Sequence, residues 1–456
     1  MASLAGLLHS HGYRVTGSDQ NVYPPMSTFL ERLGIPVLSG FREEHLKERP
    51  QLVVIGNAVS RNNPEVEAVL RVGIPYISFP QALGRFLIGS KRSIVIAGTH
   101  GKTTTTALMA WVLNQAGWEP SFFIGGMPVD FDSGFHRGGE KWVVLEGDEY
   151  DSAFFDKGPK FLHYKPEKVI LTSLEFDHAD IYRDLEHLKG AFQRLMEMIP
   201  PTGTLLVCNE YEAAREIAVF ARCPVMFYGG GDPSGWEARN LRVQSGQSVF
   251  EPCFKGRSEG MVRTQLLGRH NVSNALAVYA MSRELGIEAE ILKDSLATFS
   301  GVKRRQEVKG EVRGITVIDD FAHHPTAVRE TIEAVRAGYP GRRLWAVFEP
   351  RSNTSRRRIF AHEFPQALSG ADRVVLAGLY QPEKIPERDR LSVEEVVREI
   401  NRLSGDSRAV FIEKTQEIPV YVAAEADTGD VILVMSNGGF DGVQERILRL
   451  LEEKRA

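Results

Sequence analysis

The residues best suited to chemistry form a glycine turn between an apolar run and a helix-forming run. Gly98 and Gly101 lie in this turn, and Lys102 and Thr103 follow it directly. Backbone N–H groups at a helix N-terminus attract phosphate, a lysine adds positive charge, and a threonine hydroxyl ligates magnesium. The first glycine of an eight-residue P-loop would fall at Ile96, so the loop is shorter. The alternative is a plain glycine turn with an exposed lysine. We predict a nucleotide phosphate site at Gly98, Thr99, His100, Gly101, Lys102, Thr103 and Thr104.

Two acidic clusters follow apolar runs that are typical of strands. They are Glu146–Asp151 and Glu175–Asp180, and the second contains His178. Carboxylate oxygens suit magnesium, and an imidazole beside carboxylates can complete a second ion site. Together with the phosphate loop, these clusters favour phosphoryl transfer with one or two metal ions. Each cluster taken alone could instead be a solvated turn.

A third constellation, Asp319–Thr326, closes another apolar run. It contains His323 and His324, whose imidazoles could titrate near neutrality. The alternative is a loop pair followed by a capping residue, Thr326, at a helix start. The basic run Lys303–Arg305 lies just before, where guanidinium groups could reach phosphates across a cleft or simply be solvated.

Composition limits the class of protein. The 456 residues are 43% hydrophobic and 25% charged with a net charge of −4, so nucleic-acid binding is not implied. The three cysteines are scattered and odd in number, which favours thiols in a reducing compartment, and we expect the cytoplasm. No apolar run approaches the roughly 20 residues of a membrane span. The oligomeric state is left open.

The alternation of strand and helix patterns predicts an α/β protein of three domains. We expect a Rossmann-like domain over 1–90, a central P-loop ATPase-like domain with a mostly parallel sheet over 91–300, and a Rossmann-like α/β domain over 301–456. The predicted strands are Tyr13–Thr16, Leu52–Gly56, Tyr76–Phe79, Ser93–Ala97, Trp142–Leu145, Val169–Ser173, Thr204–Cys208, Ile315–Asp319, Leu344–Phe348, Arg373–Ala377 and Val431–Met435; helices include Ala2–His9, Ser27–Leu33, Glu65–Val72, Thr326–Arg336 and one at the C-terminus.

The first domain opens unusually. A doubly wound domain begins with a strand and a glycine turn, whereas this chain begins in the helical stretch Ala2–His9. We expect the opening strand and its glycine loop to be missing, and the diphosphate contacts they would make to be incomplete or replaced.

Six motifs in order resemble the Mur ligase family, the ATP-dependent amide-forming enzymes of bacterial cell-wall synthesis, over essentially the whole chain. The motifs are Gly98–Thr104, Glu146–Asp151, Glu175–Tyr182, Gly268–Asn271 with Asn274, Arg304–Arg305, and Asp319–Thr326. Within the family, further stretches are most similar to ligases that join UDP-N-acetylmuramate to L-alanyl-γ-D-glutamyl-meso-diaminopimelate in peptidoglycan recycling. These stretches are Tyr23–Ser27, Glu149–Asp151 followed by Phe154–Lys157, Glu349–Thr354 and Ser436–Phe440.

Other activities are possible within the same resemblance. A UDP-N-acetylmuramate:L-alanine ligase is the nearest alternative, and a non-catalytic nucleotide-binding relative is another. Ligation of the folylpolyglutamate synthase type shares the phosphate loop and acidic sites, but the UDP-sugar and tripeptide stretches do not support it.

The resemblance implies ATP and Mg²⁺ as cofactors and assigns roles to single residues. It places Lys102 on the β- and γ-phosphates, Thr103 and Glu146 on one magnesium ion, and His178 on a second. In several relatives a carbamylated lysine helps to hold that second ion, but the matching position here is near Gln193. Lys189 does not match the motif, so we expect no modified lysine. The remaining implied contacts are Asn271 with adenine, Arg305 near the γ-phosphate, Asp320 with ribose, His324 near the acceptor amine, and Asp19 and Asn57, with Ser60–Asn63, facing the UDP-sugar.

Arg351, Ser352 and Asn353 follow a predicted strand at the place where the family binds its amine substrate. An arginine fork there could pair with the carboxylates of the tripeptide. The alternative is a polar loop that caps the next helix through Ser352 or Thr354.

Overall fold

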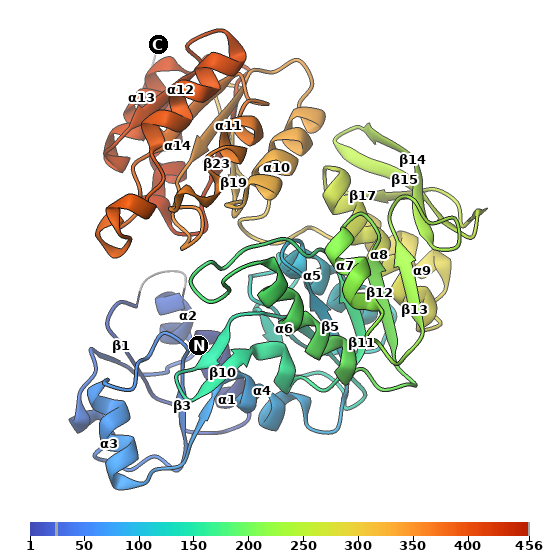
Figure 1. Ribbon diagram of the computed structural model, residues 1–456, viewed down its shortest axis with the longest axis vertical. Coiled ribbons are helices and arrows are strands. Elements are labelled where there is room, and N and C mark those ends of the chain that lie inside the picture. The colour runs from blue at the N-terminus through green and yellow to red at the C-terminus, as the bar shows by residue number, and fades with distance from the viewer. Residues whose placement is uncertain (23–25, 455–456) are drawn as a thin grey trace. The chain divides into compact units, whose positions relative to one another are not determined.

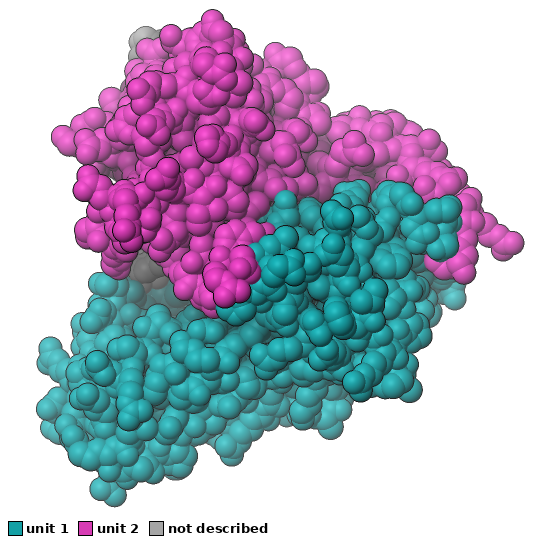
Figure 2. All heavy atoms as spheres, viewed as in Figure 1, with its two compact units in different colours: residues 1–175, 185–236, 277–295 teal, residues 176–184, 237–276, 296–456 magenta. Residues whose placement is uncertain are grey.

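The computed structural model describes residues 1–22 and 26–454, which form two compact units (Figure 2). The first unit comprises residues 1–175, 185–236 and 277–295, and the second comprises 176–184, 237–276 and 296–456. Within the predicted Tyr23–Ser27 stretch, Tyr23–Pro25 lie outside the described residues. Among the residues described, no helix combines the length and the apolar character needed to span a membrane.

The N-terminal part of the first unit is built from two small parallel strand pairs and short helices (Figure 1). Its elements are α1 (Ala2–Ser10), β1 (Gly17–Asp19), α2 (Met26–Arg32), β2 (Val37–Ser39), β3 (Val53–Ile55), α3 (Pro64–Val72), β4 (Tyr76–Ser78) and α4 (Phe79–Leu83). β1 pairs with β2, and β3 pairs with β4. The strand predicted at Tyr13–Thr16 is wrong, because pairing starts only at Gly17 and the Tyr13 ring packs edge-on against Phe86 instead.

The rest of the first unit is organised by a largely parallel sheet. Its elements are β5 (Arg92–Ala97), α5 (Lys102–Gln115), β6 (Ser121–Phe123), β7 (Phe135–His136), β8 (Trp142–Gly147), β9 (Asp151–Ala153), β10 (Asp156–Pro159), β11 (Pro166–Leu171), α6 (Leu185–Met198), β12 (Thr204–Cys208), α7 (Glu212–Ala218) and β13 (Val225–Tyr228). The parallel order is β13, β12, β11, β5, β8, β6, and β7 pairs antiparallel with β6. β5 lies between β11 and β8, so the segments that follow these three strands leave the same sheet edge.

The strand predicted at Val169–Ser173 occurs as β11, which ends two residues earlier. Thr172 and Ser173 bond to the turn after β5 through their side chains: the Thr172 hydroxyl donates to the carbonyl of His100 at 2.5 Å, and the amide N–H of His100 donates to Ser173 Oγ at 2.8 Å. These bonds add to two backbone bonds, from the amide of Thr172 to the carbonyl of Ala97 and from the amide of Thr99 to the carbonyl of Ser173.

The C-terminal part of the second unit is a doubly wound sheet. Its elements are β18 (Glu307–Val312), β19 (Ile315–Asp320), α10 (Pro325–Gly338), β20 (Leu344–Phe348), α11 (Glu363–Leu368), β21 (Arg373–Ala377), α12 (Val393–Ser404), β22 (Ala409–Ile412), α13 (Ile418–Glu425), β23 (Val431–Met435) and α14 (Val443–Glu453). The order is β18, β19, β23, β20, β21, β22, with β18 alone antiparallel.

Both faces of this sheet are covered, and the strand residues alternate between two cores. In β23, Leu433 and Met435 pack with α10, α11 and α12, whereas Ile432 and Val434 pack with α13 and α14. A strand buried on both faces reads as a continuous apolar run. That is why the predicted strands Leu344–Phe348, Arg373–Ala377 and Val431–Met435 are confirmed with unchanged bounds.

The second unit also contains a small antiparallel group and parts of two helices. The elements are β14 (Trp236–Gln244), β15 (Gln247–Phe254), β16 (Arg257–Ser258), β17 (Val262–Thr264), α8 (Arg269–Glu284) and α9 (Ala289–Thr298). β15 pairs with β16 and β17, while β14, α8 and α9 each continue from one unit into the other.

Candidate functional site

Two glycines make the turn between β5 and α5 possible. Gly101, the residue before α5, adopts a left-handed conformation with φ of 78°, which favours glycine. Gly98 has φ of 136°, and a Cβ added there would lie 2.3 Å from Thr172 Oγ1. The backbone of the predicted phosphate loop therefore approaches the neighbouring segment more closely than any side chain would allow.

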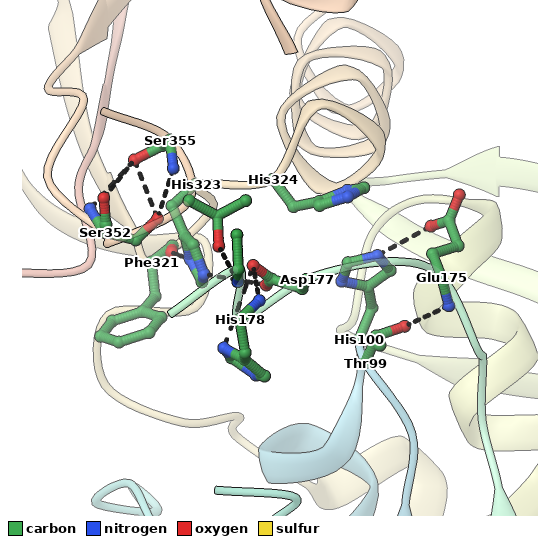
Figure 3. Close-up of polar contacts among 12 residues, drawn as sticks. Thr99, His100, Glu175, Asp177, His178, Phe321, His323, His324, Ser352 and Ser355 are labelled. Carbon is green, nitrogen blue, oxygen red and sulfur yellow. Dashed lines mark hydrogen bonds and ion pairs between the residues drawn. The ribbon is translucent and has the colours of Figure 1, made fainter. Parts of the chain in front are cut away.

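The segment after β11 holds this loop in place. Thr99 Oγ1 accepts a hydrogen bond from the amide N–H of Glu175 at 3.2 Å, and His100 Nε2 lies 2.8 Å from Glu175 Oε2 (Figure 3). Thr99 and Ser173 also bond through their hydroxyl groups at 3.1 Å. The first unit thus brings Thr99 and His100 of the predicted phosphate site together with Glu175 of the second acidic cluster.

Lys102 is held by two acceptors. Its Nζ donates to the carbonyl of Gly98 at 2.5 Å and to Glu149 at 2.9 Å. The Lys102 side chain is only 13% exposed and that of Glu149 is fully buried, so the alternative of an exposed lysine is wrong. Burial lowers the pKa of Lys102. The negative charges of Glu149 and Asp148 raise it by a larger amount, so the net shift is upward. Lys102 therefore stays protonated at neutral pH.

Thr103 and Glu146 form an oxygen pair beside Lys102. Thr103 Oγ1 donates to Glu146 Oε1 at 2.9 Å, and the other carboxylate oxygen accepts from the amide of Gly125 at 2.7 Å. Thr103 and Thr104 are both buried in the first turn of α5. A hydroxyl and a carboxylate in contact are the donors that Mg²⁺ prefers, so these residues fit that ion.

The second acidic cluster has a buried centre in the second unit. Asp177 is 3% exposed and accepts a hydrogen bond from the amide of His178 at 2.7 Å, while His323 Nε2 lies 3.7 Å from its carboxylate. Burial raises the pKa of Asp177, but the neighbouring imidazoles of His323, His178 and His324 bring it well below the ordinary value. Because Asp177 and Glu149 are buried, neither acidic cluster is a solvated turn.

The loop 176–184 carries His178, which adopts a left-handed φ of 57°. Within the second unit this loop bonds to the segment that follows β20. The amide of Ala179 donates to Thr354 Oγ1 at 3.2 Å, and Asn353 Nδ2 donates to Asp180 at 2.8 Å. The loop that carries His178 is therefore held against the segment that contains Asn353.

His324 occupies the N-cap position of α10. Its Nδ1 accepts a hydrogen bond from the amide of Thr326 at 3.3 Å, and its Nε2 lies 3.3 Å from the carbonyl of Phe176. With Nδ1 as acceptor, the proton sits on Nε2 and is donated to that carbonyl. The alternative in which Thr326 is the cap is wrong, because helix α10 starts one residue earlier, at Pro325, and proline is favoured at the first helical position.

Arg351 is fixed by stacking and by charge. Its guanidinium carbon lies 3.6 Å from the ring centre of Tyr380, and its Nη1 lies 3.3 Å from Glu349 Oε1. A Cβ on Gly438 would lie 1.8 Å from Arg351 Nε, so that glycine makes room for the guanidinium. Ser436 donates to the other oxygen of Glu349 at 2.5 Å.

Ser352 and Asn353 shape the loop that follows. Ser352 Oγ donates to Ser355 Oγ at 2.9 Å, and Asn353 Oδ1 accepts from Arg356 at 2.6 Å (Figure 3 shows Ser352 with Ser355). These contacts organise the loop, and no α-helix begins at Ser352 or Thr354. The contact of these residues with a substrate stays a prediction.

The residues expected near the base and sugar of ATP are also oriented. Asn271 donates to the carbonyl of Leu267 at 2.8 Å. Asp320 accepts from the amides of Gln306 and Ala322 at 2.8 and 2.7 Å, and burial raises its pKa. The guanidinium of Arg305 lies 4.6 Å from the ring centre of Phe321.

Asp19 and Asn57 lie in the N-terminal part of the first unit. Asp19 is the last residue of β1, and Asn57 follows β3 by two positions. Both are exposed, at the carboxyl ends of parallel strands where α/β proteins place ligands.

Sequence reasoning missed several residues that organise these groups. Glu149 and Asp177 lie within the acidic clusters, but only Glu146 and His178 had been chosen from them. Burial distinguishes the missed acids from their neighbours, and a single sequence shows no signal for it. The other missed residues are Glu349, Asp180, Thr354 and Ser355.

Comparison with known proteins supports one family over the length of the chain. The models described as "Mur ligase family, catalytic domain", "Mur ligase middle domain" and "Mur ligase, glutamate ligase domain" match residues 1–91, 96–282 and 304–438. A UDP-N-acetylmuramate–L-alanyl-γ-D-glutamyl-meso-2,6-diaminoheptandioate ligase of Escherichia coli is 41% identical, over 100% of this chain and 96% of that protein. The chain belongs to the Mur ligase family.

Two further comparisons refine the relationship of this Mur ligase. The crystal structure of a murein peptide ligase from Psychrobacter arcticus is 36% identical with a TM-score of 0.75, covering 100% of this chain and 97% of that one. A UDP-N-acetylmuramate–L-alanine ligase of Carboxydothermus hydrogenoformans is 34% identical over 98% of this chain and 94% of that protein. The predicted fold is confirmed: this is the three-domain Mur ligase fold with mostly parallel sheets, and the protein is an ATP-dependent ligase.

Proposed function

We propose that this Mur ligase joins UDP-N-acetylmuramate to L-alanyl-γ-D-glutamyl-meso-diaminopimelate in the cytoplasm, using ATP and Mg²⁺. The relatives at 41% and 36% identity, named for this tripeptide or as a murein peptide ligase, support the substrates. The observation that carries the chemistry is that Lys102 bonds to the carbonyl of Gly98 within the loop, while the next residue, Thr103, bonds to Glu146 of β8. Such a cluster serves phosphoryl transfer.

The first step forms an acyl phosphate. A carboxylate oxygen of the muramate attacks the γ-phosphorus of ATP, the bond to the β-phosphate oxygen breaks, and ADP leaves. Negative charge gathers on the phosphate oxygens during this transfer, so a fixed cation and N–H donors lower its barrier. In our proposal Lys102 and the amides of residues 98–104 supply them, and Arg305 adds a second guanidinium.

Thr103 and Glu146 would hold Mg²⁺, which when bound neutralises charge on the phosphates. We propose that His178 contributes to a second ion. Its backbone is fixed by the hydrogen bond that its amide donates to Asp177 at 2.7 Å. Asn271 and Asp320 would contact adenine and ribose.

The second step forms the amide. The uncharged amine of the tripeptide attacks the acyl carbon, the carbon–oxygen bond to phosphate breaks, and phosphate leaves as the nitrogen loses a proton. We propose that Arg351, Ser352 and Asn353 bind the tripeptide and that His324 lies near its amine. Arg351 suits carboxylates because its guanidinium is planar and held flat against Tyr380. Asp19 and Asn57 would face the UDP-sugar.

The test is a phosphate-release assay with ATP, UDP-N-acetylmuramate and one of three acceptors: L-alanine, L-alanyl-D-glutamate with a γ-linkage, or the tripeptide. We expect turnover with the tripeptide to exceed that with L-alanine by at least about 100-fold, because a site built for several carboxylates rejects an acceptor that lacks them. A mass spectrum must show the amide product.

Efficient turnover with L-alanine would favour the second candidate, an L-alanine ligase, which the relative of Carboxydothermus hydrogenoformans represents at 34% identity. Binding of ATP and UDP-sugar without any amide product would instead identify a non-catalytic nucleotide-binding relative. The domain boundaries 1–90, 91–300 and 301–456 form part of the same proposal.

A further inference from the structure

A segment between β8 and β11 links the lysine of the phosphate loop to the N-terminal part of the first unit. We define it as the bracing segment, residues 148–163, which contains the hairpin of β9 and β10 and a short 3-10 helix, Lys160–His163. All of it belongs to the first unit.

One end of the bracing segment contacts Lys102 directly. Glu149 is its second residue, and the fully buried Glu149 side chain lies 2.9 Å from Lys102 Nζ. The ammonium group has three donors, of which Glu149 and the carbonyl of Gly98 each take one. The position of Lys102 Nζ is therefore set by two acceptors, and one of them comes from outside the phosphate loop.

The bracing segment is tied to itself on both sides of Glu149. Lys160 bonds to Asp148, and Asp151 accepts a hydrogen bond from the amide of Gly158 at 3.0 Å. His163 Nε2 lies 3.0 Å from Asp156 Oδ2. Because Asp148 and Asp151 are held on either side of Glu149, Glu149 has little freedom to follow Lys102 and instead restrains it.

The hairpin in the middle of the bracing segment contacts β4. Ser78 donates a hydrogen bond of 2.7 Å to Asp156 Oδ2, and the Ser78 residue is fully buried. Beside it, the rings of Tyr76 and Phe155 meet edge to face with their centres 4.9 Å apart. β4 is one of the strands of the region predicted to bind the UDP-sugar.

We propose that Glu149 is a positioning residue for Lys102, and that Asp156 anchors the bracing segment to β4 so that Glu149 keeps this position. The inference rests on the proposed function, in which Lys102 stabilises the phosphate during transfer. It adds that the placement of the Lys102 ammonium depends on the carboxylate of Glu149, 47 residues further along the chain, and on the contact of Asp156 with β4.

The reason is electrostatic preorganisation. A cation that is already in place stabilises the transition state without a cost of reorganisation, whereas a mobile cation must first be ordered. Removing the negative charge of Glu149 leaves Lys102 free to contact bound nucleotide, so ground-state binding is preserved while the geometry of transfer is lost. The expected signature is a fall in kcat without weaker nucleotide binding.

The first measurement is of the chemical reactivity of Lys102 and does not depend on catalytic turnover. Full-length protein is treated with an amine-acylating reagent, and the extent of modification at each lysine is read by peptide mass spectrometry. In Glu149→Gln we expect Lys102 to react at least about fivefold faster than in the wild type, and in Asp156→Asn about twofold to fivefold faster, because the restraint on Nζ is lost. Lys168, another buried lysine, is the internal reference and keeps its rate.

The second measurement is a double-mutant cycle on kcat and on the Kd of a non-hydrolysable ATP analogue. We expect Glu149→Gln to lower kcat about tenfold or more with Kd within about threefold of the wild type. Asp156→Asn should lower kcat less, and the double variant should match Glu149→Gln alone, because both substitutions act through Lys102. Lys165→Gln is the matched control: Lys165 is an exposed residue just beyond the bracing segment, and its replacement should change neither readout.

The inference would be overturned by an unchanged acylation rate of Lys102 in Glu149→Gln, by multiplicative effects of the two substitutions on kcat, or by a rise in Kd that accounts for the whole loss of activity. Faster acylation of Lys168 in the same variant would mean that the fold has loosened in general, and this result would also count against the inference. Glu149→Asp, which keeps the charge, would then be measured, and in this variant the acylation rate must change at Lys102 alone. If the wild type makes no amide, the proposed function fails while the acylation result still decides the inference.

Discussion

Thr103 donates a hydrogen bond of 2.9 Å to Glu146, although 43 residues separate them in sequence. The strand order explains the contact. β8 pairs with β5 in a register that places Glu146 opposite Ile96, two residues before Gly98. The acid therefore reaches the first turn of α5 from the neighbouring strand. A carboxylate at this place serves a divalent cation, which leads to the first prediction.

Glu146→Gln should raise the Mg²⁺ concentration that gives half-maximal turnover by at least about tenfold, because an amide oxygen is a weaker ligand than a carboxylate. Magnesium titrations of turnover check this. Glu140→Gln, which alters a carboxylate that is 74% exposed, is the control and should leave the titration unchanged. An unaltered magnesium requirement in Glu146→Gln would remove this residue from the metal site.

Lys102→Met should lower turnover by about 10²-fold or more and also reduce stability by about 3 kcal/mol, because it leaves the buried Glu149 without its counter-ion. The thermal unfolding midpoint and the rate of phosphate release check the two effects. The double variant Lys102→Met with Glu149→Gln should regain most of the stability and none of the activity. Full stability in the single variant would contradict the buried ion pair.

Gly438→Ala should resemble Arg351→Ala in its kinetics. The new Cβ would lie 1.8 Å from Arg351 Nε, so the flexible guanidinium must leave its place over Tyr380. We expect the KM for the tripeptide to rise about tenfold or more in both variants, with the KM for ATP within about twofold. Steady-state kinetics with each substrate varied in turn check this. Equal losses for ATP and tripeptide would show that the glycine serves the fold instead.

Asn353→Ala and Asp180→Ala should disturb the organisation of the loop 176–184 to the same extent. The two side chains bond to each other at 2.8 Å, and each substitution removes the same contact. If Asn353 also binds the tripeptide, as we propose, Asn353→Ala raises the KM for the tripeptide further than Asp180→Ala does. Identical KM values in the two variants would assign Asn353 to the organisation of the loop 176–184 alone.

Glu349→Gln should become more stable relative to the wild type as the pH rises from 4.5 toward neutrality. Burial raises the pKa of Glu349 above its ordinary value of 4.5, although Ser436 and Arg351 partly oppose this. A carboxyl group with a raised folded-state pKa contributes stability that is fully present below its unfolded-state pKa and lost as the pH passes the folded-state pKa. Thermal midpoints of both proteins across this pH range check the sign. A difference that shrinks with rising pH would contradict it.

Much of the fold could be predicted because buried parallel strands are continuous apolar runs. Leu344–Phe348 and Val431–Met435 illustrate this, with bounds that match the structure. Edge strands were missed where their faces are partly exposed: β18 alternates half-buried and exposed residues around Gly310 and lacks an apolar run. In the N-terminal region, Tyr13–Thr16 has the composition of a strand but lacks a pairing partner, which composition cannot reveal.

The candidate site was predictable only where local spacing carries the chemistry. The glycine turn and Lys102 are adjacent in sequence, and Glu146 follows from the strand order. Glu149 and Asp177 could not be selected, because their importance arises from burial against Lys102 and His323, residues far away in the chain. For the same reason the capping role of His324 was missed, since it depends on where α10 begins.

The contacts of the loop 176–184 determine where the chain can be cut to make fragments or chimaeras. The loop is encoded within the region of the central sheet, yet it supplies the carboxylate that binds Asn353 and the amide that binds Thr354. A recombinant fragment made only of residues 301–456 would lose both partners. When C-terminal portions are exchanged between homologous ligases, the chimaera should fold best if residues 176–184 come from the same ligase as the C-terminal portion.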